Sequence, residues 1–523
     1  MSSRRGAVLV GTGILGSRMA GLVRQRVLAH FLGTTDAADA LNAAFRIPNL
    51  LQNLFGEGVL SASFIPAYAR LLGQGREEEA RRLAGAVLAA LSLVIALLVA
   101  LGVLATPWLV AMFLPEWDAD KQQHTATMVR LLFPATGILV LSAWCLGILN
   151  AHRRFLVSYA APIVWNAAII AAVLVAGARG EEQIAIAAVL GALIGSVLQV
   201  VVQVPQVRRL GGAIRPTRWA AVPESRTVFR TFLPALVSRG AMQISSFIDL
   251  ALAGFLPAGA VTVMTSAQVL YLLPVSLFGM SVSASELPEM ARECADPEQV
   301  QARLRIRLDA ATQRLAFYIV PSAVAFLALG GVLASAIYQG GAFTASDARW
   351  VWTILAGAAV GLLASTWGRL YSSAFYALQD ATTPLRCGLI RIGLTAILGV
   401  VAALYLPEWL GIDATWGAAG ITLAAGFAGW VEFTLLRRAL CRRLGRFALP
   451  MRELLRLWAA ALLAAVPATL VRLAVTEQSP IVTALLVLPV FGLAYLLVTW
   501  RLDMPEAAVL VNRLVRRRSG AGR

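Results

Sequence analysis

Apolar runs of membrane-crossing length recur from one end of this 523-residue chain to the other, and they constrain its fold more than any other feature. Clear examples lie at 84–105, 159–177, 184–204, 457–475 and 481–500. A helix of about 20 apolar residues crosses a hydrocarbon layer about 30 Å thick. Only 14% of the residues are charged, against about 25% in soluble domains, so most of the surface must face lipid. The sequence therefore predicts an all-α integral membrane protein.

About 14 transmembrane helices account for these runs, and the charges of their connections predict the topology. We place the spans near 6–32, 37–66, 83–106, 127–149, 157–177, 184–204, 229–255, 260–286, 312–338, 350–377, 386–406, 415–436, 455–475 and 480–500. Arginine-rich connections alternate with short neutral or acidic ones. Because cytoplasmic loops carry the excess of basic residues, both termini are expected in the cytoplasm. The net charge of +17 thus reflects topology and some attraction to anionic membrane lipids, and no nucleic-acid partner is expected.

Two similar halves and an appendix are predicted from repeated local patterns. Arg208-Arg209-Leu210-Gly211 closes the sixth span, and Arg442-Arg443-Leu444-Gly445 closes the twelfth, at an offset typical of duplicated six-helix bundles. We expect two pseudo-symmetric six-helix lobes followed by two C-terminal helices. The expected segments are an N-lobe at 1–210, a basic cytoplasmic linker at 211–228, a C-lobe at 229–445, helices 13 and 14 at 446–502, and a basic cytoplasmic tail at 503–523.

Motifs for catalysis or cofactor binding do not fit this chain. Residues 11–16 match the dinucleotide fingerprint G-x-G-x-x-G, but membrane helices follow in place of a βαβ unit. The histidines and cysteines are scattered without metal-type spacing, and no ATP-binding loop is present. We therefore expect a transporter and not an enzyme, with no cofactor, no metal site, and transport driven by a Na⁺ or H⁺ gradient or by the membrane potential.

One polar helix face is predicted along the span 37–66. Its members, which we call the polar stripe, recur every three or four residues: Asp39, Asn42, Arg46, Asn49, Asn53 and Glu57. A charge facing lipid near the membrane centre costs about 2.5–3.5 kcal/mol, so the stripe must face protein or a water-filled cavity. Lining of a substrate cavity is the interpretation we favour, and hydrogen bonding between helices is the alternative. Pro48 is a candidate bend point within it.

Arg18, Arg24 and Arg26 lie in the preceding span, although Arg26 could instead extend to the membrane interface. These three cations exceed the two carboxylates of the stripe, and guanidinium groups bind phosphate with paired hydrogen bonds. The pattern indicates an anionic, phosphate-bearing substrate, and Arg369 in the tenth span is expected to add to the same cationic site. Asp249 in the seventh span either binds a coupling cation or proton, or pairs with Arg239 or another helix.

The chain resembles the MurJ (MviN) family. The resemblance rests on Ser17-Arg18, Gly21, Arg24, Gly33, Asp39, Phe45, 48–51, Phe55, Glu57-Gly58 and 64–66, and on Phe375-Tyr376, Gln379-Asp380 and Thr383-Pro384. Members of this family belong to the multidrug/oligosaccharidyl-lipid/polysaccharide exporter superfamily. They flip lipid II, the undecaprenyl-diphosphate-linked peptidoglycan precursor, across the bacterial inner membrane.

The resemblance implies a V-shaped central cavity between the two lobes and a groove for the lipid tail along the two C-terminal helices. It places Arg18 and Arg24 among the cavity arginines, and Asp39 and Glu57 among the acidic residues. Two departures concern this site. Gln52 stands where the family often has an arginine, and 268–274 lack the charges that many members carry before the proline of the eighth helix.

Three other functions remain open at this point. The first is a flippase for another polyprenyl-linked glycan, such as an O-antigen or exopolysaccharide unit. A cation-coupled drug exporter is the second, for which a more acidic cavity and 12 helices would be expected. The third is a scaffold that binds cell-wall synthesis proteins without transporting anything; such proteins are also candidate partners of a flippase.

Overall fold

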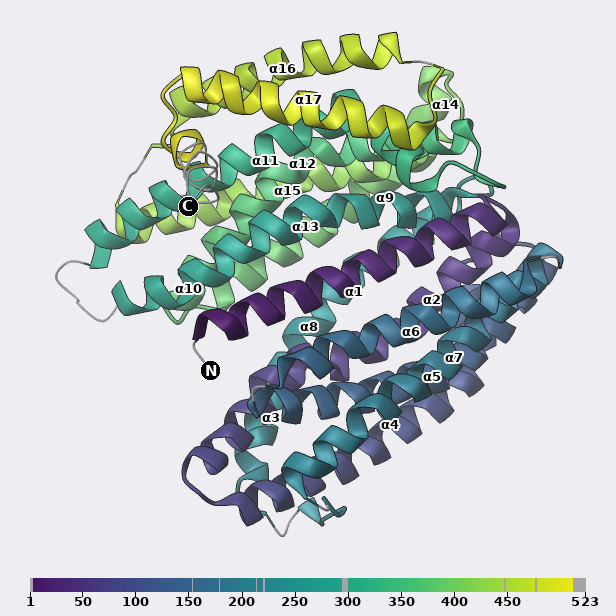
Figure 1. Cartoon of the computed structure of the whole chain (residues 1–523), viewed down its shortest axis with the longest axis vertical. Helices are drawn as coiled ribbons and strands as arrows, with labels where there is room; N and C mark the ends of the chain where they lie inside the picture. Colours follow the sequence, from purple (N-terminus) through teal and green to yellow (C-terminus); the bar gives the residue numbers. More distant parts are fainter. Residues whose placement is uncertain are drawn as a thin grey trace, which may run out of the picture. The chain divides into compact units, whose positions relative to one another are not determined.

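The computed structural model describes residues 3–510 apart from 153, 178, 213, 220–221, 294–299, 446–447 and 476, and these residues form helices joined by short turns (Figure 1). The helices are α1 (Ser3–Leu32), α2 (Asp36–Phe55), α3 (Glu57–Gly73), α4 (Glu77–Phe113), α5 (Ala119–Ala151), α6 (Phe155–Ala176), α7 (Glu181–Gly211), α8 (Ser225–Gly254), α9 (Ala260–Pro274), η2 (Val275–Met280), α10 (Ser281–Glu293), α11 (Val300–Tyr338), α12 (Ala345–Ala377), α13 (Thr382–Val400), η3 (Val401–Tyr405), α14 (Leu406–Leu410), α15 (Trp416–Leu444), α16 (Met451–Ala474) and α17 (Pro480–Arg501). The extended backbone recorded among these residues is one bridge, between Gly340 and Phe343. The predicted all-α fold is confirmed.

Each predicted span coincides with one helix or with consecutive helices, although the boundaries move by up to 12 residues, at the start of α11. Within the described part of the chain, 10 helical segments are both long and apolar enough to cross a membrane. The four other predicted spans correspond to α1, to α2 with α3, to α6 and to α8. The total of about 14 crossings therefore stays a prediction that is consistent with the structure. The predicted basic tail lies largely at 511–523, outside the described residues.

The second predicted span is two helices and not one. α2 continues through Pro48 and ends at Phe55, and Glu57 begins α3. At Gly56 the N–H donates to the Gln52 carbonyl at 2.8 Å, and a Cβ there would lie 2.2 Å from that oxygen. Only glycine fits such a close approach, so the helix breaks there and not at the proline. Glu57 therefore does not continue the stripe along α2, and its side chain lies outside the described residues.

The described chain forms two compact units, which are treated separately below. The first comprises 1–262 and 340–343, and the second comprises 263–339 and 344–523. α8 packs on α2, α3 and α4, so it belongs by contacts to the first unit, although the repeat places it at the start of the second lobe. The division into lobes at 211–228 remains a prediction from the repeat.

Small residues bring helices together in the same way in both units. In the first, α7 packs on α6 (Figure 1), and a Cβ at Gly191 would lie 2.9 Å from the Ala168 carbonyl oxygen. In the second, a Cβ at Gly420 of α15 would lie 2.4 Å from the carbonyl oxygen of Ala402 in η3. Glycine permits this approach because lipid provides no hydrophobic force between helices, which instead associate through close packing.

α16 and α17 pack on each other and on α11, within the second unit (Figure 1). The Tyr495 hydroxyl of α17 donates to the Phe317 carbonyl of α11 at 2.7 Å. Leucines such as Leu463, Leu470 and Leu493 remain largely exposed, as expected for side chains that face lipid. The groove for a lipid tail remains a prediction.

A tight turn joins α12 to α13, and one carboxylate organises it. Gln379 takes a positive φ of 58°, and Asp380 then accepts hydrogen bonds from the N–H groups of Thr382 and Thr383 at 2.9 and 3.0 Å. The Thr383 hydroxyl donates at 2.7 Å, and Arg443 of α15 donates at 2.6 Å. Asp380 thus provides acceptors for the start of α13 and attaches it to α15.

We expect Asp380→Ala to lower the free energy of unfolding by about 1 kcal/mol, because the donors at the turn lose their acceptor near solvent. Bonds from the Thr383 hydroxyl and N–H, together with the Arg443 charge, hold the pKa of Asp380 below its usual value. The stabilisation is therefore present above the usual pKa and is lost as pH falls through the lowered one. Thermal unfolding of the detergent-solubilised protein between pH 3 and 7 measures both effects.

Asp413→Ala is the matched control, because Asp413 accepts one backbone hydrogen bond, from Thr415 at 2.8 Å, before α15. The smaller set of contacts predicts a smaller loss of stability. Equal losses for the two variants would show that the additional contacts of Asp380, from Thr383 and Arg443, contribute nothing.

Candidate functional site

The three arginines of α1 have different surroundings. Arg18 is exposed and Arg26 is half-buried, and both make polar or electrostatic interactions. Arg24 places its guanidinium carbon 4.9 Å from the centre of the Trp165 ring on α6. Its Nε is buried and has no hydrogen-bond partner among the described residues. A buried guanidinium donor without an acceptor is unfavourable, so Arg24 is the member of the set best suited to meet an anion.

The polar stripe faces α8 and the start of α9 within the first unit. Asn42 donates to the Thr262 hydroxyl at 3.2 Å, and Asn53 donates to the Gln243 carbonyl oxygen at 2.9 Å. Arg46 donates to the Ser246 hydroxyl through Nε at 3.1 Å and through a terminal nitrogen at 3.0 Å. These three residues hold helices together, which is the alternative raised by the sequence. Their contact with a substrate stays a prediction, as does that of the exposed Asn49.

Asp249 lies one helical turn beyond Ser246 on α8 and is close enough to attract the charge of Arg46. Ser246 contacts the Arg46 guanidinium directly, and Asp249 acts on it through charge. This arrangement favours pairing with another helix over a cation site for Asp249. A role in ion coupling stays a prediction, and the side chain of Arg239, the other partner considered, lies outside the described residues.

The buried carboxylate of Asp39 sits at the N-terminus of α9. It is only 2% exposed and accepts from the N–H groups of Gly259 at 2.7 Å and Thr262 at 2.9 Å, and from the Thr262 hydroxyl at 2.8 Å. A carboxylate is stabilised at a helix N-terminus by these free N–H groups and by the helix dipole. Asp39 therefore connects α2 to the start of α9, and its contact with a substrate stays a prediction.

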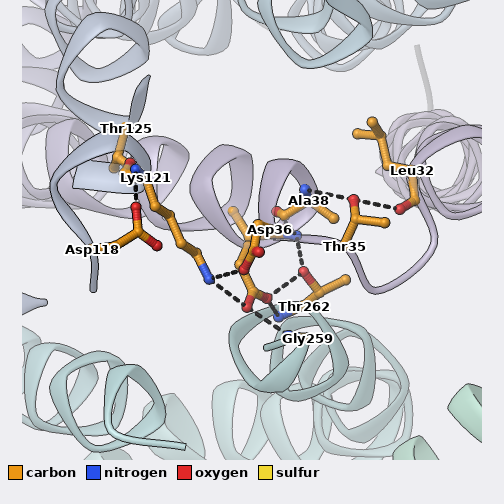
Figure 2. Close-up of polar contacts among 11 residues, drawn as sticks. Leu32, Thr35, Asp36, Ala38, Asp118, Lys121, Thr125, Gly259 and Thr262 are labelled. Atoms are coloured by element: carbon orange, nitrogen blue, oxygen red, sulfur yellow. Dashed lines mark hydrogen bonds and ion pairs between the residues drawn. The ribbon is translucent and has the colours of Figure 1, made fainter. Parts of the chain in front are cut away.

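Lys121, which is the only lysine in the sequence, supplies the counter-charge to this cluster. Its ammonium lies 2.5 Å from Asp36 (Figure 2) and 3.4 Å from Asp39. The same ammonium lies 4.0 Å from the centre of the Trp117 ring. The side chain is 9% exposed. Lys121, Asp36 and Thr262 come from different helices, so no sequence pattern predicted them as members of one site. The solitary lysine was the one available signal.

Arg369 of α12 lies in the second unit, with a buried Nε that has no hydrogen-bond partner among the described residues. It shares with Arg24 the unmet donor expected of an anion-binding guanidinium. Whether it joins Arg18, Arg24 and Arg26 in one site remains a prediction.

The charges of the first unit thus fall into two groups. Asp39 and Asp36 share the single positive charge of Lys121, and Arg46 contacts the Ser246 hydroxyl and is attracted by the charge of Asp249 on α8. Arg24 has no ion pair recorded among the described residues, and an aromatic ring is its recorded contact. Chemically, this arrangement can hold an anionic group such as a phosphate beside α1.

Comparison with known proteins places the chain in one group. A family model described as the lipid II flippase MurJ matches residues 28–492. A protein of Rhizobium tropici named a probable lipid II flippase MurJ is 30% identical over 450 residues, covering 85% of this chain and 82% of that protein. A solved structure of the lipid II flippase MurJ in an inward closed conformation matches with a TM-score of 0.75 and 21% identity, over 97% of this chain and all 100% of that one. An inward-facing multidrug transporter of the MATE family, in the MOP superfamily, matches with a TM-score of 0.64 and 18% identity, over 82% and 95% of the two chains. The two structures bear on the fold.

We expect Lys121→Met to lower the free energy of unfolding by about 3 kcal/mol. Removal of one partner from a buried ion pair typically costs about 3–5 kcal/mol, and the 64% exposure of the Asp36 side chain places this case at the low end. Thermal unfolding in detergent, followed by size-exclusion chromatography of the soluble fraction, measures the loss.

The double variant Lys121→Met with Asp39→Asn provides the control, because the amide removes the uncompensated charge while keeping an acceptor for α9. It should be more stable than Lys121→Met alone. A double variant as unstable as the sum of the two single ones would contradict the electrostatic role of the lysine.

Proposed function

The chain belongs to the lipid II flippase MurJ family, and from that premise we propose that it translocates lipid II from the inner to the outer leaflet of the bacterial cytoplasmic membrane. It is a multi-pass membrane transporter and not an enzyme. Its transport supplies the precursor for peptidoglycan synthesis outside the membrane, and thereby cell-wall biogenesis and cell shape.

The buried guanidinium of Arg24, whose Nε has no acceptor among the described residues, is the observation that best supports an anionic lipid substrate. A buried guanidinium Nε without a protein acceptor is unfavourable, and a diphosphate oxygen would provide the acceptor. Lipid II carries such a diphosphate between its polyprenyl chain and its sugar. We infer that the diphosphate binds Arg24, with Arg18 and Arg26 on the same helix as further cationic partners, and Arg369 as a candidate contribution from the second unit.

Movement of the headgroup requires alternating access, in which the site opens first to the cytoplasm and then to the outside. An inside-negative potential would contribute about 2.3 kcal/mol per elementary charge per 100 mV to moving negative charge outward. Only uncompensated charge gains from this drive, so a site that neutralised the diphosphate fully would gain little. Coupling to Na⁺ or H⁺ is the other source of energy, with Asp249 as the candidate residue.

Both termini are proposed to lie in the cytoplasm, as the arginine-rich connections predict. The polyprenyl chain would remain in the membrane along α16 and α17, whose leucines face outward. Membrane lipids surround the protein, and cell-wall synthesis proteins are the proposed macromolecular partners.

Depletion of this protein in its own host should leave lipid II on the inner side of the membrane. Lipid II that has reached the outer leaflet is cleaved by an externally added lipid II-degrading enzyme, so cleavage should fall and intact lipid II should accumulate. Wild type should restore cleavage, and Arg24→Ala should not, because the guanidinium for the diphosphate is lost. Arg24→Lys should restore it in part, since lysine keeps the charge without the paired donors.

Unchanged cleavage after depletion, in a host shown to have no second flippase, would overturn the assignment of lipid II. Full rescue by Arg24→Ala would leave the flippase activity in place and would exclude Arg24 as an essential contact.

Gly21 lies one turn before Arg24 on α1, and a Cβ at this position would meet no atom within 4 Å. We expect Gly21→Leu to weaken lipid II binding several-fold, because the side chain fills space beside the guanidinium, while helix propensity slightly raises stability. The matched control is Gly492→Leu on α17, which also has open space around it. Affinity for a fluorescent lipid II analogue in nanodiscs is the measurement, and equal effects at both positions would contradict a site beside Gly21.

A further inference from the structure

Trp165 of α6 packs closely against α7. Its indole N–H donates to the Ala192 carbonyl at 3.1 Å. A Cβ at Gly195 would lie 3.0 Å from both the Trp165 ring and the Trp165 carbonyl oxygen, so the two helices meet with no intervening side chain. Gly191 and Gly195 provide the spacing that lets helix backbones approach closely in membranes. The backbone of α7 therefore fixes the position and orientation of the indole.

The same indole also contacts α1 and α2. The Phe45 ring of α2 packs edge-on against it, with 6.2 Å between ring centres and an angle of 80°. The Arg24 guanidinium lies over the ring at 4.9 Å. An aromatic face attracts a cation through its quadrupole, most strongly where water is excluded. Three helices, α2, α6 and α7, thus fix one surface on which the guanidinium of the fourth, α1, rests.

The contact between Arg24 and the Trp165 ring differs from an ion pair because it leaves the N–H donors of the guanidinium available. A carboxylate partner would occupy the N–H donors of Arg24 and cancel its charge, as Lys121 does for Asp39. The ring face attracts the cation without accepting a hydrogen bond in the plane of the guanidinium. The buried Nε of Arg24 indeed keeps its donor unused among the described residues. An anion arriving in that plane finds a fixed charge with its donors still available.

We propose that Trp165 is a positioning residue for the anionic group of the substrate, because its ring holds the Arg24 guanidinium in a set orientation while leaving the donors for the ligand. This inference rests on the proposed function only in taking Arg24 as the contact for a phosphate-bearing lipid. Trp165 itself does not touch the substrate in this role. A ring face at this position is the requirement, and the indole N–H serves the attachment to α7.

Two substitutions separate these two properties of the side chain. Trp165→Phe keeps an aromatic face and loses the hydrogen bond to Ala192, whereas Trp165→Leu loses both. With the full-length protein in nanodiscs and fluorescent lipid II as probe, Trp165→Leu should weaken binding about tenfold, and Trp165→Phe should stay within about threefold of wild type. The unfolding temperature should fall for both variants, since both lose the bond to α7.

Trp144→Leu is the matched control, because Trp144 is buried in the same unit and donates to the Ala84 carbonyl at 3.2 Å. It should lose stability without the tenfold loss of affinity.

A double-mutant cycle with Arg24→Ala completes the test. If Trp165 acts through Arg24, adding Trp165→Leu to Arg24→Ala should cause no further loss, and the affinity for undecaprenol, which has no phosphate, should not change in any variant. Equal losses for Trp165→Phe and Trp165→Leu, in proportion to their unfolding temperatures, would overturn the positioning role. Wild-type binding by Trp165→Leu, together with defective binding by Arg24→Ala, would also overturn the positioning role. The proposed function would stand in that case. Wild-type binding of lipid II by Arg24→Ala would overturn the anion site itself, and the inference with it.

Discussion

A charge that is removed from water into a membrane protein must be neutralised or stabilised by polar contacts, and this constraint organises the first unit. Asp39 meets it with two backbone N–H groups, a hydroxyl and Lys121. Arg46 meets it with Ser246 and the nearby charge of Asp249. In each case the partners come from other helices, so the demand for neutralisation also determines which helices pack together. α2, α5, α8 and the start of α9 are connected in this way.

Arg24 meets the same constraint differently, and the difference is what makes it a candidate for binding a substrate. Its charge rests on an aromatic ring, and one of its buried donors has no acceptor among the described residues. Arg46 lies one helix away and has the same side chain, yet its donors are used by Ser246. Two identical side chains thus serve different roles because their neighbours differ in the ability to accept a hydrogen bond. The role of an intramembrane arginine depends on its partners and not on its depth alone.

Close helix packing through glycine gives this site its fixed geometry. Gly191 and Gly195 allow α7 to reach the backbone of α6, and Gly56 permits the break that ends α2. Both features depend on the absence of a Cβ, because a side chain would collide with a carbonyl oxygen within about 3 Å. The glycine contact of α15 with η3 is of the same kind as the contact of α7 with α6, and the two similar halves expected from the sequence stay a prediction. A rigid arrangement behind Trp165 is compatible with large movements elsewhere, since the two packed helices can move as one body.

The amino-acid sequence alone predicts the membrane-embedded helical class, the place of most helices to within about a dozen residues, and the family. Apolar length and arginine distribution are properties of the chain alone, since lipid sets the required length and the basic residues set the expected orientation. The periodicity also identified the polar face of α2, but it missed the break at Gly56. The cause of that break leaves no periodic signal, because it is the lack of room for a Cβ, which would lie 2.2 Å from the Gln52 carbonyl oxygen. Which polar side chains of that face bond to other helices depends on the tertiary structure. Asn42, Arg46 and Asn53 find partners on α8 and α9 about 190 to 220 positions away, and Lys121 reaches Asp36 and Asp39 from α5. Such pairings follow from the packing of helices distant in sequence, and for the same reason only the structure brings Trp165 to Arg24.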